Sequence, residues 1–479
     1  MLRSPYFLLL LTLGTTQLSA CAQSTTDKPA GAPVAVRPGQ PLPWLDSLLT
    51  ASPILRLHQV GMSLAYADSA RPFYGYQEAK YFTPASNMKL FSLYAGLHIL
   101  TDSLPSLRYF SRNDTLFFQG TGDPTLLHGD VPSRRAYSFL LNRPEKTLAY
   151  CDIATVAPFG PGWTWDDYGY YFQPERAAFP IYGNTVRFYA TPPAPVRAGG
   201  VAAVRPAGVP QSRIRVLPRY FAPLVGPAPA ELRTPGLDPD THVIRALHEN
   251  RFYVLPTTKK WVDETPFVAS RGLMLRLLGD TLRRATSNAV WRPRPAQGDS
   301  IRTLHGLRVD SLYRRMLRVS DNFLAEQLLL MCSTKTGFRD SLSTGRAIRY
   351  ARKNLLGTLP DPVHWVDGSG LSRLNLVTPR TLTALLLKLH QEVPERRLLS
   401  LLAAGGGQGT LRKRYHDAAG PWVWGKTGTL SNNLNMCGYL RTKSGRLVAF
   451  TFMNNNHVAE SGAMRNEVER VLAQVRARL

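Results

Sequence analysis

Three short motifs, far apart in the chain, constrain its fold and chemistry most. They are a Ser-x-x-Lys motif from Ser86 to Lys89, a Ser-Asp-Asn motif from Ser320, and a Lys-Thr-Gly motif from Lys426. The first two precede apolar helical patterns, and the third lies in a strand pattern over 422–430. Alone, Ser-x-x-Lys is more often an N-cap serine followed by a surface lysine. All three motifs in this order, each in a fitting helix, loop or strand, indicate one site.

The first motif favours a nucleophile beside a base. Residues three apart on a helix project from the same face, so Ser86 and Lys89 lie one turn apart. A hydroxyl at the helix N-terminus lies at the positive end of the helix dipole, where an alkoxide is favoured. A desolvated lysine has a lowered pKa and can accept a proton. We therefore predict that Ser86 attacks and Lys89 is its base.

The three motifs together are the signature of penicillin-binding proteins and class A β-lactamases. The gap between Ser86 and Ser320 is too long for a compact β-lactamase and requires an inserted region. This spacing resembles the class C low-molecular-mass penicillin-binding proteins, the penicillin-binding protein 4 type of serine D-alanyl-D-alanine carboxypeptidase/endopeptidase. Smaller motifs of that family recur at 122–126, 161–167, 182–184, 367–373 and 409–412. The resemblance covers about residues 45–475 and is looser across 190–236.

The resemblance implies an α+β fold, a penicillin-binding protein/β-lactamase-like transpeptidase domain. A mainly antiparallel sheet would carry helices on both faces, with the active site between the sheet edge and the helical lobe. This catalytic domain would comprise residues 43–104 and 262–479. Residues 105–261 would form one or two inserted accessory domains. The apolar patterns agree, with strands expected near 58–66 and 73–80.

The N-terminus predicts export. Residues 1–20 have the basic start, apolar stretch and small residues of a signal peptide. Leu-Ser-Ala-Cys21 resembles a bacterial lipobox, which is cut before the cysteine that is then acylated; the alternative is ordinary cleavage after Ala22. Residues 21–42 are rich in Pro and Ala and read as a tether. We therefore expect a periplasmic lipoprotein held to a membrane by its lipid anchor.

Charge and cysteine content exclude other classes of protein. The formal net charge is +25, but the basic residues are scattered and export makes nucleic acid an improbable partner. Four cysteines without a C-x-x-C pair argue against a structural zinc site. We expect Cys151, Cys332 and Cys437 to be buried apolar residues; the last two could pair only if the fold brings them together. The reaction implied by the resemblance needs no metal or organic cofactor.

The resemblance also implies roles for the remaining motif residues. Ser320 and Asn322 would relay the proton to the leaving D-alanine and orient the peptide. Lys426 would bind the terminal carboxylate and lower the pKa of Lys89 by charge repulsion. Substrate-binding positions would follow in the same strand at Thr427, Gly428 and Thr429. The backbone N–H groups of Ser86 and Thr429 would form the oxyanion hole. The substrates would be peptidoglycan peptides, and β-lactam antibiotics would inhibit by stalling at the acyl-enzyme.

Six further positions match the pocket that, in related enzymes, recognises the free end of a diaminopimelate side chain. They are Trp163, Asp166, Tyr171, Arg373, Leu430 and Ser431. Asp166 would offer a partly buried acid, Arg373 a donor, and the aromatic and apolar residues the walls. Core packing is the alternative for Trp163 and Tyr171, and a surface charge is the alternative for Asp166. We expect Asp367 to fix a turn rather than touch substrate.

The sequence also has features of three other functions. A β-lactamase or esterase of the same fold is opposed by the long insertion, and a non-catalytic peptidoglycan-binding lipoprotein is opposed by the intact motifs. Residues 420–427 also match the phosphate-loop pattern G-x-x-x-x-G-K-[ST]. Pro-Trp-Val-Trp fills the place of a flexible loop, and no helical pattern follows, so we reject nucleotide binding. The oligomeric state is left open.

Overall fold

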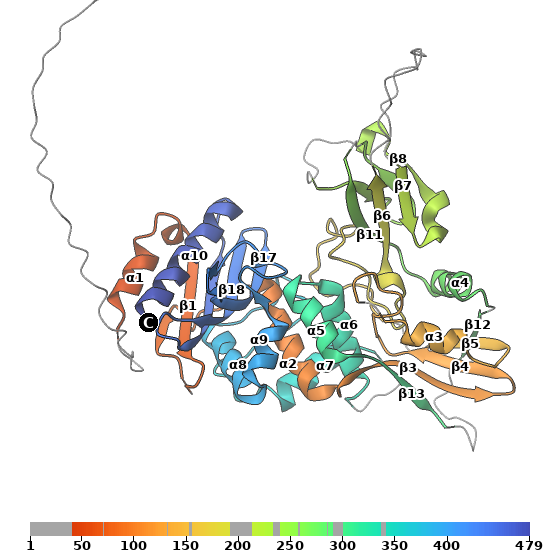
Figure 1. Cartoon of the computed structure of the whole chain (residues 1–479), viewed down its shortest axis with the longest axis horizontal. Helices are drawn as coiled ribbons and strands as arrows, with labels where there is room; N and C mark the ends of the chain where they lie inside the picture. Colours follow the sequence, from red (N-terminus) through yellow and green to blue (C-terminus); the bar gives the residue numbers. More distant parts are fainter. Residues whose placement is uncertain are drawn as a thin grey trace, which may run out of the picture. The chain divides into compact units, whose positions relative to one another are not determined.

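The chain is described here by a computed structural model (Figure 1). It describes residues 41–69, 71–131, 133–152, 156–191, 213–232, 240–256, 259–284, 286–290, 300–336 and 342–479. The expected signal peptide, Cys21 and nearly all of the tether lie outside these residues. Within the described ranges, no helix combines the length and apolar character needed to cross a membrane.

The largest sheet joins the two ends of the described chain. Its six strands have the order β14-β17-β18-β19-β1-β2, and every pairing is antiparallel. The strands are β1 (Gln59–Tyr66), β2 (Tyr74–Tyr76), β14 (Ala403–Ala404), β17 (Val423–Leu430), β18 (Asn433–Arg441) and β19 (Leu447–Asn455). β1 pairs with β19 along its whole length, from Gln59 with Asn455 to Tyr66 with Val448. The strand expected over 73–80 is shorter, because a turn follows Tyr76.

Helices cover both faces of this sheet (Figure 1). Successive side chains of a strand point to opposite faces. In β18, Met436 and Leu440 belong to one apolar cluster, and Cys437 and Tyr439 to another. The first cluster includes α1 (Pro43–Thr50) and α10 (Ser461–Arg478); the second includes α8 (Pro379–Glu392). The expected α+β fold, an antiparallel sheet between helices, is confirmed.

The central helix α2 (Lys89–Ile99) carries the first motif. A short 3-10 turn, η2 (Ala85–Met88), precedes α2 and contacts β17 and β18. On its other side α2 packs against α6 (Asn322–Ser333). The remaining helices of this layer are α5 (Val309–Arg318), α7 (Thr344–Asn354) and α9 (Glu395–Leu401). The turn η2, which holds the predicted nucleophile Ser86 and is called the nucleophile turn below, therefore lies between a sheet strand and the helical layer.

The inserted region has its own sheets and its own apolar core. A five-stranded sheet has the order β12-β5-β4-β3-β13, and two three-stranded sheets have the orders β11-β6-β7 and β8-β10-β9. The elements are β3 (Ser103–Arg112), β4 (Thr115–Gly120), α3 (Arg135–Leu141), β5 (Thr147–Asp152), η3 (Tyr182–Asn184), β6 (Thr185–Thr191), β7 (Arg213–Leu217), η4 (Arg219–Leu224), β8 (Val225–Pro227), β9 (Val243–Arg245), β10 (Phe252–Val254), β11 (Trp261–Pro266), α4 (Arg271–Leu282), β12 (Thr286–Val290) and β13 (Arg302–Arg308). A separate apolar cluster runs from Leu107 to Leu282.

Strand pairing bears on the domain boundaries. The boundary expected at 262 falls inside β11, which pairs with β6 of the insertion. β12 pairs with β5, and β13 pairs with β3. Since hydrogen-bonded strands of one sheet fold as a unit, we propose that the inserted region extends from β3 to β13. Sequence patterns could not place this boundary, because the partner strands lie far apart in the sequence.

Candidate active site

The Ser86 hydroxyl and the Lys89 ammonium meet at the start of α2. Ser86 is half-buried in η2, and Lys89 is fully buried. Lys89 Nζ donates to Ser86 Oγ at 2.9 Å, to Asn322 Oδ1 at 2.5 Å and to the carbonyl oxygen of Ser369 at 2.7 Å. These three acceptors match the three N–H donors of an ammonium, and none is a carboxylate.

Burial is the largest influence on Lys89. It lowers the pKa of Lys89 to about 8, although the charges of Asp367, Asp321 and Glu326 act to raise it. We expected Lys426 to lower this pKa by repulsion; burial of the ammonium is instead the main cause. Lys426 itself is fully buried, and burial together with the charge of Lys89 holds the pKa of Lys426 well below its ordinary value. Lys89 thus has the lowered proton affinity that a base requires.

The second and third motifs meet through Ser320 and Lys426. Lys426 Nζ donates to Ser320 Oγ at 2.8 Å and to the carbonyl oxygen of Thr427 at 2.6 Å. Ser320 has a left-handed backbone (φ 64°) between α5 and α6, and the following Asp321 caps α6 by accepting from Leu324 N at 3.0 Å. A non-glycine residue in this region is held there only by its surroundings. The turn aims the Ser320 hydroxyl at Lys426.

Strand β17 approaches the nucleophile turn closely. Asn87 Nδ2 donates to the carbonyl oxygen of Lys426 at 2.7 Å. A Cβ atom at Gly428 would collide with the Pro84 carbonyl and the Asn87 side chain, so the glycine of Lys-Thr-Gly permits this contact. Within the described chain, β14 pairs with β17 only at Trp424 and Gly425. Beyond that point Thr427 is half-buried and Thr429 is exposed, at an edge of β17 that β14 does not cover.

The candidate side-chain pocket forms around the turn over 367–374. Trp163 Nε1 donates to Asp367 Oδ2 at 2.8 Å. The Arg373 guanidinium donates to the Ser431 carbonyl oxygen at 3.2 Å, and Leu430 is half-buried at the end of β17. The structure therefore brings Trp163 from the insertion and Arg373, Leu430 and Ser431 from the main domain to neighbouring positions.

Asp166 and Tyr171 are less tightly held than expected. Asp166 is exposed, so the partly buried acid is not present in this state of the protein. The Tyr171 side chain is 64% exposed and stacks edge to face on Phe172 at 5.5 Å between ring centroids. The carbonyl oxygen of Phe172 accepts from Asn322 Nδ2 at 2.9 Å. Tyr171 therefore directly precedes the residue whose backbone contacts the second motif, but neither Asp166 nor Tyr171 is buried.

Sequence reasoning missed two residues near Lys89, one that accepts from it and one that holds the acceptor. Ser369 supplies a backbone carbonyl, which no side-chain motif reveals. Glu326 accepts from Ser369 N at 2.8 Å. The sequence could have indicated Glu326 by its distance from the second motif. Glu326 follows Asn322 by four residues and therefore lies on the same face of α6. Asp367 fixes the turn as expected, by accepting from Gly370 N at 2.9 Å and Ser372 N at 2.8 Å.

Other expectations concern cysteines and metals. Cys151, Cys332 and Cys437 are buried and free. Lys426 lies inside a strand that continues to Leu430, so the phosphate-loop pattern has neither the loop nor the helix it needs. No group of three or more His, Cys, Asp or Glu side chains in the described ranges is placed to hold a metal ion.

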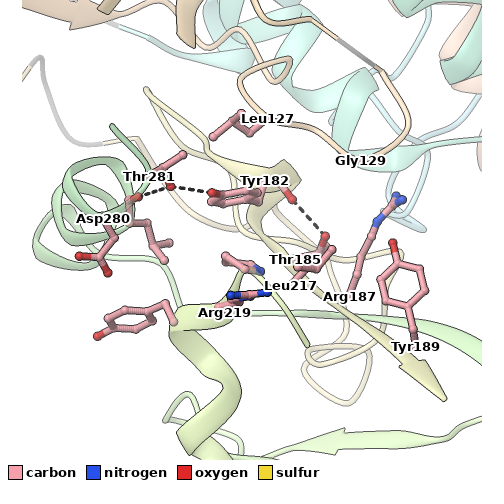
Figure 2. A pocket seen from close by; sticks show the side chains of 13 residues that line it. Leu127, Gly129, Tyr182, Thr185, Arg187, Tyr189, Leu217, Arg219, Asp280 and Thr281 are labelled. Carbon is pink, nitrogen blue, oxygen red and sulfur yellow. Dashed lines mark hydrogen bonds between the residues drawn. The ribbon is translucent and has the colours of Figure 1, made fainter. Parts of the chain in front are cut away.

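A separate cavity of about 530 Å³ lies in the inserted region (Figure 2). It is lined by Leu127, Gly129, Tyr182, Thr185, Arg187, Tyr189, Leu217, Pro218, Arg219, Tyr220, Leu277, Asp280 and Thr281. Figure 2 shows the Tyr182 hydroxyl turned toward Thr281 Oγ1, at 2.6 Å. Arg187 forms ion pairs with Asp130 and Glu264. The cavity contains no residue of the three motifs.

Comparison with known proteins decides the family. The profile of the D-Ala-D-Ala carboxypeptidase 3 (S13) family matches residues 43–212 and 268–478. The chain belongs to this family. Among curated relatives, carboxypeptidase DacB of Mycolicibacterium smegmatis is 31% identical over 150 residues, which cover 30% of this chain and only 33% of that protein. D-alanyl-D-alanine carboxypeptidase DacB of Haemophilus influenzae is 22% identical over 415 residues, or 80% of this chain and 82% of the relative.

Solved structures support the S13 fold. The crystal structure of penicillin binding protein 4 from Haemophilus influenzae matches with a TM-score of 0.67 at 20% identity, covering 90% of this chain and 98% of that chain. At this identity the match shows the fold alone.

Proposed function

We propose that this S13 protein is a serine-type D-alanyl-D-alanine carboxypeptidase/endopeptidase that acts on peptidoglycan stem peptides and cross-links. The observation that carries the proposal is the position of Lys89 Nζ, buried within hydrogen-bond distance of both Ser86 Oγ and Asn322 Oδ1. Family membership and the two carboxypeptidase relatives support the same substrate class.

Acylation begins when neutral Lys89 accepts the Ser86 proton. Ser86 Oγ then attacks the carbonyl carbon between the two terminal D-alanines, and the backbone N–H groups of Ser86 and Thr429 stabilise the oxyanion. Collapse of the tetrahedral intermediate breaks the C–N bond. The proton that Lys89 took up passes through the Ser320 hydroxyl to the leaving amine while Asn322 orients the peptide, so that D-alanine departs and an ester to Ser86 remains. Water then hydrolyses the ester and restores the enzyme.

Lys426 and Thr427 bind the terminal carboxylate of the substrate. Lys426 is held near Ser320 with a strongly lowered pKa in the free protein. An anion within hydrogen-bond distance raises the pKa of a lysine, so arrival of the carboxylate favours the charged form of Lys426. The uncovered edge of β17 would hold the extended peptide as an added strand, with the Gly428 and Thr429 backbone beside it.

Side-chain specificity would come from the pocket at the 367–374 turn. Trp163, Tyr171 and Leu430 would contact the methylene stem of diaminopimelate. Arg373, fixed on Ser431, would donate to its distal carboxylate. Asp166 would pair with its distal ammonium. Because Asp166 is exposed, that contact would form only with substrate present.

We further propose that the protein is exported to the periplasm and anchored by acylated Cys21. The signal-like residues 1–20 and the lipobox support this. Cys21→Ala should convert a membrane-bound product into a soluble or unprocessed one, as measured by fractionation and by the mass of the mature protein. A wild-type mature protein that is soluble and begins at Gln23 would contradict the anchor.

Two incubations test the function. With fluorescent penicillin, we expect one stable covalent adduct on Ser86. With a peptide ending in D-Ala-D-Ala, we expect release of D-alanine. Rapid turnover of penicillin without peptide cleavage would favour a β-lactamase or esterase. Absence of both adduct and cleavage would favour a peptidoglycan-binding lipoprotein without activity.

A further inference from the structure

The peptide unit that holds Lys89 is itself held by α6. The Ser369 carbonyl oxygen accepts from Lys89 Nζ at 2.7 Å, and the Ser369 N–H donates to Glu326 Oε1 at 2.8 Å. The side chain of Glu326 therefore acts on the base through one residue. Asn322, one helical turn earlier on the same face, touches the base directly.

Glu326 is buried between two donors. It is fully inaccessible, and its second oxygen lies 3.3 Å from Arg176 Nη1, on an arginine that is itself buried. Burial and the charge of Asp367 act to raise the pKa of Glu326, while Arg176 and the Ser369 N–H act to lower it. Because both hydrogen-bond partners donate, the arrangement suits the ionised carboxylate, which only accepts.

The turn around Ser369 has little freedom to move. A Cβ atom at Gly368 would lie 2.7 Å from the Ala325 carbonyl oxygen of α6, and one at Gly370 (φ +82°) would collide with the Ala85 carbonyl. The Gly368 carbonyl also accepts from Ser92 Oγ at 2.7 Å. The turn therefore packs tightly between α6 and the nucleophile turn. A displacement of the turn would also displace the Ser369 carbonyl oxygen that accepts from Lys89.

We propose that Glu326 is a positioning residue for acylation: through the Ser369 peptide it fixes the place of the Lys89 ammonium, and it keeps a negative charge beside the base. The inference rests on the proposed function, in which Lys89 is the base for Ser86. The role differs from that of Asn322 because Glu326 does not touch Lys89, Ser86 or substrate.

The charge has a measurable consequence. The charged groups that influence Lys89 are Asp321, Asp367 and Glu326, which raise its pKa, and the neighbouring Lys426. Removing the charge of Glu326 therefore lowers the pKa of Lys89. Acylation needs neutral Lys89 and rises with pH through that pKa. The inflection should accordingly move to lower pH in a Glu326→Gln variant.

The experiment measures penicillin acylation of the full chain against pH. For Glu326→Gln we expect a plateau rate at least ~10-fold lower, because the Ser369 peptide is misplaced, and an inflection about one pH unit lower, as for loss of a nearby opposite charge. Glu326→Asp retains the charge but cannot reach the peptide equally well. It should lower the plateau and leave the inflection near the wild-type value.

Gln327→Met is the matched control on the same helix. Gln327 is buried and donates to the carbonyl oxygens of Gly122 and Ala177 at 2.7 and 2.8 Å, away from Lys89. This variant should lose thermal stability without moving the inflection.

The outcomes separate the two proposals. If the acylation profile of Glu326→Gln has its inflection at the wild-type pH, the inference is overturned. If Glu326→Gln does not fold, a Glu326→Asp variant that reacts at the wild-type rate would overturn it instead. A wild-type protein that penicillin does not acylate would instead overturn the proposed function.

Discussion

Two regions of the molecule hold cations in opposite ways, one fully buried and the other half-buried. In the active site, Lys89 donates to a hydroxyl, an amide oxygen and a backbone carbonyl, and its pKa falls to about 8. Beside the cavity of the inserted region, Arg187, which is labelled in Figure 2, is paired with the carboxylates of Asp130 and Glu264. Neutral acceptors hold a cation in place without compensating its burial, whereas carboxylates compensate it. The first arrangement suits the proton acceptor that we propose Lys89 to be, and the second joins loops and strands.

The largest effect is expected when the predicted nucleophile Ser86, next to Lys89, is removed. Ser86→Ala should abolish covalent labelling by fluorescent penicillin, because among the described residues Ser86 carries the one hydroxyl that accepts from Lys89. Thermal unfolding should change little, since the half-buried hydroxyl contributes little packing. Mass spectrometry of the wild-type adduct is the check. A drug attached to another residue would contradict the Ser86 assignment.

Replacing the base tests whether the neutral acceptors matter. Lys89→Arg retains a cation that stays protonated. We expect acylation to fall at least ~10²-fold, as for loss of a positioned general base. Stopped-flow or gel-based rates of penicillin labelling measure it. A rate close to wild type would mean that Lys89 only fills space.

The pH profile sharpens the comparison without mutation. Because the pKa of Lys89 is about 8, its neutral fraction is small at pH 6 and grows as the pH rises. Below pH 8, acylation of the free enzyme should fall about tenfold per pH unit. Acylation that is constant from pH 6 to 9 would show that Lys89 is not the titrating base.

Replacing Asp166 should have an effect smaller than the changes at Ser86 and Lys89 and larger than a change in the inserted region. As an exposed acid it should contribute about as much as a surface ion pair, up to ~1 kcal/mol or roughly fivefold. Asp166→Asn should lower kcat/KM by this amount for peptides with a free diaminopimelate end. A diacetylated lysine peptide and penicillin are the controls and should be unaffected. Equal losses on both peptides would indicate a role in the fold instead.

The smallest effect on catalysis is expected in the inserted region. Thr281→Val keeps the shape of the side chain but loses its hydrogen bonds to Tyr182 and to the Leu277 carbonyl oxygen. Stability should fall by about 1 kcal/mol, as seen for single hydrogen bonds. Penicillin acylation should stay at the wild-type rate. A slower rate in a folded variant would mean that the cavity is coupled to the active site.

The sequence predicted the features of the structure that depend on local residue patterns. The strand around Lys426 and the helix after Ser86 follow from periodicity, and their side chains indicated the chemistry. The Ser369 carbonyl could not be predicted, because any residue supplies a carbonyl and only the three-dimensional turn selects this one. The boundary expected near 262 falls inside β11, and the boundary that we propose after β13 depends on strand pairing, that is, on contacts between distant segments. The exposure of Asp166 likewise depends on tertiary packing.

The pairing of β1 with β19 has a consequence for biogenesis. The two strands are neighbours in the sheet although they lie far apart in the sequence. His58, which directly precedes β1, is hydrogen-bonded to Asn454 of β19, and 396 positions separate these two residues. Contacts between such distant segments form late, because the intervening chain must first be brought together. During synthesis and translocation, β1 and the nucleophile turn therefore exist before the strands that complete their sheet. A nascent chain lacking β17 to β19 carries the serine but no assembled site, so hydrolytic activity first arises when the C-terminal strands arrive.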